Sequence, residues 1–325
     1  MKKIIIVFIL TISFLLLSCS KVSDVKRLKI GHGLDRTHSV HKAMEYLAEK
    51  AKEKSNGTLE ITVYPSQQLG TERQCLELLQ IGSLAMTKVS CSVLEGFVPI
   101  YKVFSLPYIF NNDEHKYKIF EGQIGKELLL KTEPFWLRGL CFYDAGSRSF
   151  YTKDKLIKTP DDLAGLKIRT QESATSVRMV NAMGGSATPI AWGELYTALQ
   201  QGVVDGAENN PPSFYLSRHY EVCKYYTINE HTGVPDVLVI STVVWDDLNE
   251  QEQKWLQEAA DESYIYQKKL WKESTLESLE AVKAAGVEVS YPDKQPFIDK
   301  VQPLLEEFKS EKDVYEIIQN IRNVK

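Results

Sequence analysis

Apolar residues recur along this chain with two alternating periods, and this alternation limits the possible folds more than any other feature. The first stretch follows the order 28–32 (strand), 39–55 (helix), 59–64 (strand), 72–81 (helix) and 84–90 (strand). A second stretch repeats it as 166–170 (strand), 174–183 (helix), 187–190 (strand), 194–201 (helix) and 203–206 (strand). Strands alternating with helices of this length form β-α-β units and parallel sheets. We therefore expect an α/β protein of two lobes, each a mostly parallel sheet flanked by helices.

One segment is too long to belong to a single small lobe. Residues 249–285 contain neither proline nor glycine and are rich in Glu, Lys, Gln, Ala and Leu, and Gly286 follows them. A helix of this length would extend about 55 Å at 1.5 Å per residue. The segment is therefore predicted to brace both lobes. Residues 287–290 and a final helix from Phe297 onward would complete the second lobe.

The N-terminus has the features of an export signal. Lys2 and Lys3 precede an apolar run over 4–17, which is shorter than the roughly 20 residues that cross a bilayer, and Ser18-Cys19 follows. Ser18-Cys19 resembles a bacterial lipobox, so residues 1–18 are predicted to be a signal peptide and Cys19 to carry a lipid. The expected location is the periplasm or the cell surface, with membrane attachment only through Cys19.

Composition and motifs exclude several classes of function. Without residues 1–18 the chain has 307 residues and a formal net charge of −6, so nothing favours a nucleic acid partner. A P-loop, a G-x-S-x-G elbow and an H-E-x-x-H motif are all missing from the sequence. We therefore expect no enzyme activity and no cofactor.

Four cysteines follow the lipobox, at positions 75, 91, 141 and 223. They could pair in three ways or serve as small buried hydrophobic residues, and their spacing does not decide between these alternatives. His38 and His41 have i, i+3 spacing and could offer two metal ligands, but the sequence places no third. Two solvated histidines at the start of a helix are the favoured interpretation, so no metal site is predicted.

The candidate binding residues follow the second set of strands. Ligands of open parallel sheets bind beyond the carboxyl ends of the strands, and these ends lead here to Arg169, Trp192 and Asn209. Arg148 lies where the chain would enter the same lobe. Two guanidinium groups, an amide and an indole could bind an organic anion, because a guanidinium matches a carboxylate. Each residue also has a purely structural interpretation, as a salt-bridged arginine, a packed indole or a turn amide.

The same segments resemble the substrate-binding proteins of tripartite ATP-independent periplasmic (TRAP) transporters, the DctP family. The likeness covers nearly the whole mature chain. It is carried by residues 59–70 (LEITVYPSQQLG), 105–110 (SLPYIF), 165–170 (GLKIRT), 185–189 (GSATP) and 194–209 (ELYTALQQGVVDGAEN).

This resemblance implies a periplasmic binding protein fold with a ligand cleft between two hinged lobes. Domain I would comprise residues 22–144 plus 234–273, and domain II residues 145–233 plus 274–325. Arg169 would pair with the ligand carboxylate, Arg148 and Asn209 would complete a polar clamp, and Trp192 would line the pocket. Weaker candidates for ligand contact are Glu72, His38, Ser90 and Asp236.

The resemblance also implies a ligand and a partner. Residues 188–194 and 207–214 resemble the branch that binds hexuronates such as D-glucuronate and D-galacturonate. A C4-dicarboxylate, an aldonate and a 2-oxo acid are alternatives, whereas Gly33 and Ser90 stand where sialic acid binders carry other residues. The partners would be the membrane subunits of a TRAP transporter. An enzyme acting on carboxylates would need a nucleophile or base beside Arg169, and a metal-capturing lipoprotein would need metal on His38 and His41.

Overall fold

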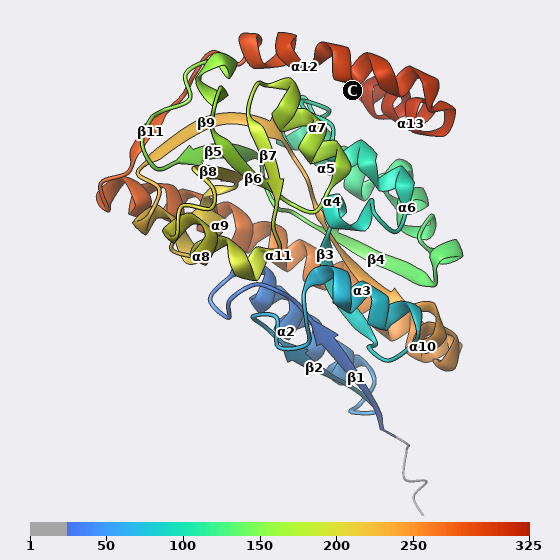
Figure 1. Ribbon diagram of the computed structural model, residues 1–325. Coiled ribbons are helices and arrows are strands. Elements are labelled where there is room, and N and C mark those ends of the chain that lie inside the picture. The colour runs from blue at the N-terminus through green and yellow to red at the C-terminus, as the bar shows by residue number, and fades with distance from the viewer. Residues whose placement is uncertain (1–24) are drawn as a thin grey trace, which may run out of the picture.

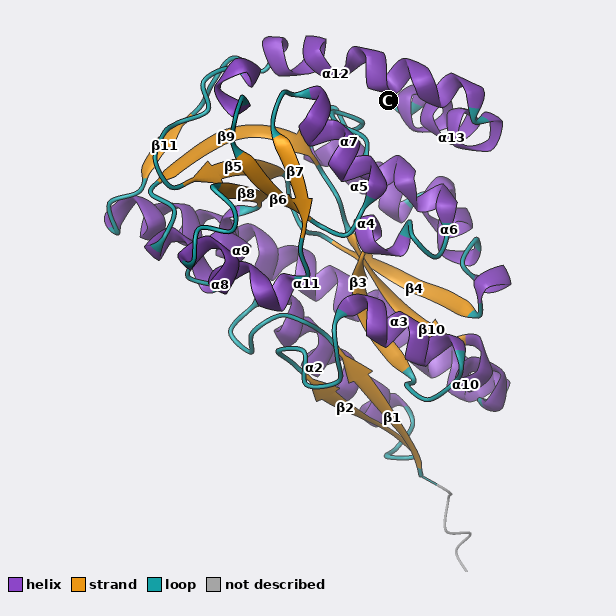
Figure 2. Cartoon of the chain, in the orientation of Figure 1, coloured by secondary structure: helices purple, strands orange, loops and turns teal. Residues whose placement is uncertain are grey.

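The structure, a computed structural model, describes residues 25–325 and contains two lobes, each built on one sheet with helices packed against it (Figure 1, Figure 2). The predicted signal peptide and Cys19 lie outside the described residues. The predicted architecture of two α/β lobes is confirmed. Within residues 25–325, no helix is long and apolar enough to cross a membrane.

The first sheet has the strand order β2-β1-β3-β10-β4. Its strands are β1 (Lys26–Gly31), β2 (Leu59–Tyr64), β3 (Met86–Ser90), β4 (Leu137–Tyr143) and β10 (Asp236–Ser241). Its helices are α2 (Ser39–Lys54), α3 (Glu72–Gln80), α4 (Cys91–Leu94), α5 (Asp113–Glu121), α6 (Gln123–Leu130) and α10 (Thr242–Asp247), with 3-10 turns η2 (Pro99–Ser105) and η3 (Glu133–Phe135).

The second sheet has the order β11-β9-β5-β8-β6-β7. Its strands are β5 (Arg148–Thr152), β6 (Lys167–Thr170), β7 (Ser186–Pro189), β8 (Gly206–Asn209), β9 (Tyr225–Thr232) and β11 (Glu288–Ser290). Its helices are α7 (Ala174–Ala182), α8 (Leu195–Gln200) and α9 (Pro211–Leu216), with 3-10 turns η4 (Pro160–Leu163), η5 (Trp192–Glu194) and η6 (His219–Glu221).

Both sheets are mixed. The β-α-β units give parallel pairs, β1 with β2 and β3, and β6 with β7 and β8. The antiparallel pairs involve β10, which lies between β3 and β4, and β5, which lies between β8 and β9. These strands adjoin the two connections between the lobes, because β4 leads into β5 and β9 leads into β10.

One predicted strand was misplaced. The segment 203–206 forms a turn up to Gly206, and β8 instead runs from Gly206 to Asn209. Glu208 and Asn209 are buried in this strand because β5 pairs with it along its length. Hydrophobic periodicity does not indicate a strand whose buried residues are polar, which explains the error.

The predicted long helix is confirmed as α11 (Glu250–Ala284), which packs against α2 and β4 of the first lobe and α9 of the second. The predicted final helix is instead two helices, α12 (Gln295–Glu307) and α13 (Lys312–Asn323), separated by the turn η7 (Phe308–Ser310). Helix α12 packs on α7 and β9, whereas α13 packs on α6 and η2. The C-terminal segment therefore contacts both lobes, and the domain boundaries given above remain predictions.

The connection from β4 to β5 is fixed on α11. Gln267 exchanges two hydrogen bonds with the backbone of Asp144, at 2.9 and 2.7 Å, and Lys116 pairs with the Asp144 carboxylate at 2.8 Å. Gly146 follows with φ of +59°, and a Cβ atom there would lie 3.0 Å from Nε1 of Trp271 on α11. A side chain at position 146 would thus be strained and would displace the indole.

The four cysteines of the described chain, Cys75, Cys91, Cys141 and Cys223, are buried and unpaired. They occupy the hydrophobic clusters under the two sheets, together with aliphatic and aromatic side chains. The structure therefore favours their interpretation as small buried hydrophobic residues.

Candidate functional site

A cavity lies between the two lobes, at the carboxyl ends of strands β1, β3, β6 and β8. It is lined by seven of the eight side chains that the sequence singled out for ligand contact, namely Arg148, Asn209, Trp192, Glu72, His38, Ser90 and Asp236. The eighth, Arg169, is buried behind this wall. Lys88, Gln171 and Trp271 also line the cavity and were not predicted.

Arg169 is a buried cation without a carboxylate partner among residues 25–325. Its Nε and Nη2 atoms donate to the carbonyl oxygen of Ile190 at 2.8 and 2.6 Å, while Nη1 is buried and makes no hydrogen bond within residues 25–325. Its Cζ atom lies 5.9 Å from the centroid of the Trp192 ring, which does face the cavity. Burial lowers the pKa of Arg169 to about 10, so the side chain stays charged at neutral pH. A buried, charged donor without a partner is costly, which indicates a site for an anion.

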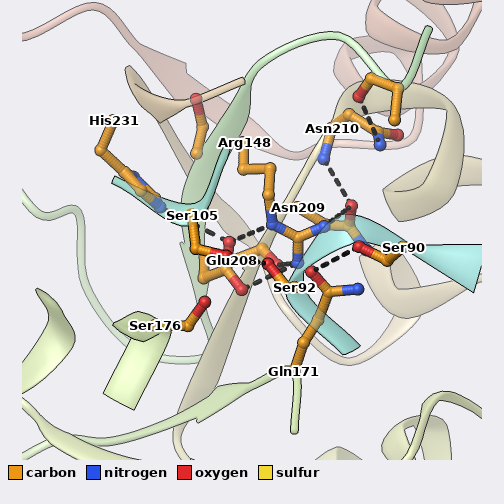
Figure 3. Close-up of polar contacts among 12 residues, drawn as sticks. Ser90, Ser92, Ser105, Arg148, Gln171, Ser176, Glu208, Asn209, Asn210 and His231 are labelled. Atoms are coloured by element: carbon orange, nitrogen blue, oxygen red, sulfur yellow. Dashed lines mark hydrogen bonds and ion pairs between the residues drawn. The ribbon is translucent and has the colours of Figure 1, made fainter. Parts of the chain in front are cut away.

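Arg148, by contrast, is fully engaged (Figure 3). Its guanidinium forms an ion pair with Glu208, in which Nη2 donates to Oε1 at 2.8 Å, and Nη1 donates to Oδ1 of Asn209 at 3.0 Å. Burial alone would lower the pKa of Arg148, but the charge of Glu208 outweighs this effect and raises it. Arg148 and Asn209, which were expected to bind the ligand together, are therefore hydrogen-bonded to each other. The side-chain nitrogen of Asn209 makes no hydrogen bond within residues 25–325.

Three ionised side chains of the first lobe form a second buried group. Lys88 on β3 lies 2.7 Å from a carboxylate oxygen of Glu72 and 3.2 Å from one of Asp236. Burial would lower the pKa of Lys88, but the two carboxylates together raise it, so it remains a cation. The group carries one more negative than positive charge when all three are ionised. A lysine in a strand whose other residues are uncharged and buried was the sequence signal that could have identified it.

His38 presents an unpaired donor to the cavity. Its Nδ1 atom accepts a hydrogen bond from the backbone of Val40 at 3.2 Å and caps α2, so the remaining proton lies on Nε2. This nitrogen is buried and has no partner within the described part of the chain. Burial and the nearby Lys88 lower the pKa of His38 to about 3, and the ring is neutral at pH 7.

The two histidines of the metal alternative point to different places, and both are buried, so their interpretation as solvated residues was wrong. The His41 ring lies 2.9 Å from His32 and 3.1 Å from Glu45, whereas His38 faces the cavity. In the described part of the chain, no group of three or more His, Cys, Asp or Glu side chains is arranged to hold a metal ion.

Two indole rings provide apolar surface, one from each side of the cavity. Trp192 comes from the second lobe, and a Cβ atom at Gly33 of the first lobe would lie 3.5 Å from its ring. Trp271 comes from the bracing helix α11, and its ring centroid lies 5.8 Å from that of His38. The lone tryptophan expected from the sequence is thus one of a pair.

The lobes are closed on each other by direct hydrogen bonds. Ser90 of the first lobe donates to the Gln171 side chain of the second at 3.2 Å (Figure 3). Glu95, at the end of α4, accepts from the Ser173 hydroxyl at 2.8 Å and from the Thr175 backbone at 3.0 Å, and so caps α7 of the opposite lobe. A carboxylate at a helix N-terminus is stabilising, so these contacts hold the closed form.

The charges define what the cavity can bind. Glu72 and Asp236 neutralise Lys88, and Glu208 neutralises Arg148. Of the cations at this cavity within residues 25–325, Arg169 alone has no carboxylate in contact. The arrangement is suited to one negative charge, several hydroxyl groups and a flat apolar face.

Comparison with known proteins gives a consistent family. Residues 30–312 match the model for bacterial extracellular solute-binding proteins of family 7, DctP. The C4-dicarboxylate-binding periplasmic protein DctP of Rhodobacter capsulatus is 34% identical over 276 residues, which cover 84% of this chain and 82% of that protein.

Solved structures are similar over almost the entire chain. A TRAP periplasmic solute binding protein from a Bradyrhizobium species, in complex with D-galacturonate, is 37% identical with a TM-score of 0.90, and the match covers 92% of this chain and 100% of that one. Another, from Anaerococcus prevotii with bound D-glucuronate, is 37% identical with a TM-score of 0.88, covering 91% of this chain and 98% of that one.

Proposed function

The chain belongs to the DctP family, family 7 of the bacterial extracellular solute-binding proteins, and on this basis we propose that it captures a hexuronate for uptake by a TRAP transporter. It is a binding protein rather than an enzyme, and it acts outside the cytoplasm. The best candidates are D-galacturonate and D-glucuronate, which are bound in the similar solved structures. In this proposal the ligand carboxylate pairs with Arg169 and the two lobes close around the sugar.

The observation that carries the proposal is the unpaired Nη1 atom of Arg169 in a buried, closed site. A carboxylate there would neutralise the charge and satisfy the donor through a charge-assisted hydrogen bond. The rest of a hexuronate is a hydroxylated ring. Its hydroxyl groups match the His38 Nε2 donor and the carboxylates of Glu72 and Asp236, and its apolar face matches the indoles of Trp192 and Trp271.

A C4-dicarboxylate, the ligand in the name of the Rhodobacter relative, fits this cavity less well. Its second carboxylate would approach either Lys88, which already pairs with the two carboxyl groups of Glu72 and Asp236, or Arg148, which Glu208 already neutralises. Like charges in a buried site repel strongly. One unpaired cation thus favours a monoacid.

A thermal-shift screen tests the ligand class. We expect a hexuronate at about 100 times its dissociation constant to add roughly 2.7 kcal/mol to the free energy of unfolding, and so to raise the melting temperature by about 5 °C. Succinate and malate should leave the melting temperature unchanged. A higher melting temperature with succinate, and an unchanged one with both hexuronates, would refute the substrate assignment. A higher melting temperature only with aldonates or 2-oxo acids would instead assign the ligand to one of those classes.

The lipid anchor at Cys19 and the membrane subunits of a TRAP transporter are part of the same proposal. Ser18-Cys19 supports the anchor, and the resemblance to TRAP binding proteins supports the partners. Mass spectrometry of the N-terminal peptide from the purified full chain should find a diacylglycerol thioether on Cys19. An unmodified thiol there would contradict the anchor while leaving the ligand proposal intact.

Glu95 offers a test of closure that leaves the cavity untouched. Because its contacts join α4 of the first lobe to α7 of the second, Glu95→Ala should destabilise the closed form by about 1.4 kcal/mol and weaken hexuronate binding roughly tenfold. The measurement is titration calorimetry. A matched control is Glu252→Ala, which removes a capping carboxylate from α11 within the first lobe and should lower stability without changing affinity. Unchanged affinity in Glu95→Ala would show that this contact does not contribute to closure.

A further inference from the structure

Three large apolar side chains are exposed together at one end of the first lobe. Ile81, Trp136 and Val243 are 70%, 60% and 53% exposed. We call them the end patch. Side chains of this size are seldom left in water as a group on a monomeric protein, and such groups commonly mark contact with a protein or a membrane.

Two close approaches of the chain bring the residues of the end patch near one another. The backbone nitrogen of Thr242, next to Val243, donates to the Trp136 carbonyl oxygen at 3.2 Å. A Cβ atom at Gly82, next to Ile81, would lie 3.0 Å from Cγ1 of Val243. Residues distant in sequence are therefore brought together by the loop before β4, the turn after α3 and the start of α10.

The end patch faces away from the ligand cavity. Strands β1 and β3 begin at this end, and β10 ends here at Ser241 (Figure 2). Ser90 at the end of β3 and Asp236 at the start of β10 line the cavity at the other end of these strands. The patch and the ligand thus lie at opposite ends of the first sheet.

The start of the described chain lies beside the same end. Lys26, the first residue of β1, forms an ion pair at 2.6 Å with Asp247, the last residue of α10. Val243 lies four residues earlier in α10, about one helical turn away. Cys19 precedes Lys26 by seven residues, so a fully extended tether would span at most about 24 Å.

We propose that the end patch rests on the surface of the lipid bilayer and orients the anchored protein there. The inference depends on the proposed lipidation of Cys19, which would confine this end of the molecule to the membrane surface. Tryptophan is favoured at the interface between lipid and water because its ring is apolar and its N–H is polar. Resting on the end patch would direct the cavity of the undocked protein away from the membrane, where a ligand can enter, and the protein would leave this orientation to dock on the membrane subunits.

A lipid surface fits the end patch better than a protein partner does. A standard protein interface buries about 800 Å² and 20–30 residues on each side, which is far more than three side chains. Charges around the patch have both signs, as in the pair of Lys26 with Asp247 and that of Arg138 with Glu133. The contact should therefore be apolar and nearly independent of the fraction of anionic lipid.

Labelling of an introduced thiol tests the proposal on the full, lipidated chain. The native cysteines of the described chain are buried, so Val243→Cys would provide the accessible thiol. On phosphatidylcholine vesicles, its reaction with a charged maleimide should be several-fold slower than for the same variant made without residues 1–19, which carries neither the signal peptide nor a lipid. The control Leu276→Cys lies on α11 at a site 63% exposed, and vesicles should not change its labelling rate. Hexuronate binding by both variants verifies their folding.

The outcomes separate this inference from the proposals on which it rests. Equal labelling rates for Val243→Cys with and without vesicles, on a chain whose Cys19 carries lipid, would overturn the inference alone. An unmodified Cys19 would overturn both this inference and the proposed lipid anchor. The proposed ligand would be unaffected, because hexuronate binding is measured separately. Protection that required the transporter's membrane subunits in the vesicles would assign the end patch to a protein partner and also overturn it.

Discussion

Arg169→Ala should weaken hexuronate binding by roughly 100-fold or more, because truncating one partner of a buried charge pair costs about 2–5 kcal/mol. The guanidinium is buried, remains charged, and has one nitrogen without a partner in the described chain. A carboxylate in the closed site would lose its ionic partner in a poorly hydrated environment. Titration calorimetry with D-glucuronate and D-galacturonate measures the effect.

Two further substitutions make the result specific. Arg178→Ala removes an arginine that pairs with Glu307 on the surface of the same lobe and should leave affinity unchanged. Arg169→Lys keeps the charge but cannot donate to Ile190 through two atoms while presenting a third, so we expect an intermediate affinity. If Arg169→Ala bound as tightly as the parent, the ligand carboxylate would have to lie elsewhere, with Arg148 the first alternative.

Glu208→Gln should lower the free energy of unfolding by about 3 kcal/mol, because it leaves the buried guanidinium of Arg148 without a counter-charge. The change keeps the shape of the side chain and removes only its charge. Urea denaturation without ligand at pH 7 measures this loss. The matched control is Glu307→Gln, which breaks the exposed pair with Arg178 and should cost less than about 1 kcal/mol. Equal losses in the two variants would contradict a special role for the buried pair.

The same pair predicts a pH dependence. Burial alone would raise the pKa of Glu208, but Arg148 and His231 outweigh burial and lower it to about 2. A carboxyl group with a depressed pKa in the folded state stabilises the protein above its unfolded pKa of about 4.5, here by roughly 3 kcal/mol. This contribution is lost as the pH falls toward 2. The stability difference between the parent and Glu208→Gln should therefore shrink across this range, and a constant difference would refute the assignment.

The strand and helix periods predicted the two lobes because those elements bury apolar faces, and the long stretch without proline or glycine predicted the long helix. They misplaced β8 because its buried residues, Glu208 and Asn209, are stabilised by ionic and amide contacts with Arg148 rather than by hydrophobic burial. Polar strands of this kind become recognisable only when their partners are known. The periodicity of apolar residues thus predicts the helices and strands of the scaffold, but it does not predict the polar strand β8 at the binding site.

The candidate site was predicted in part for a similar reason. The rule that ligands bind at the carboxyl ends of strands selected Trp192 and Asn209, which line the cavity, and Arg169, which does not. Arg148, selected because the chain enters the second lobe there, also lines the cavity. The rule does not fix side-chain direction, and the Ile190 carbonyl oxygen holds Arg169 behind the wall. Trp271 lines the cavity from α11, and Glu95 at the end of α4 contacts the opposite lobe. Only tertiary packing brings these two helices to those places. Their roles could not be predicted from the order of the elements.

The fixed connection beside Gly146 has a consequence for how the binding protein takes up its ligand. Gln267 holds Asp144 on α11, and Gly146 is the next residue able to turn freely, directly against the indole of Trp271. We expect the pivot of the opening motion to lie there. Trp271 would then stay in place with α11, while Trp192 would move with the second lobe. A sugar acid would first bind on the side of Trp271, and an optical measurement of the distance between the two tryptophans would report how far the lobes have closed.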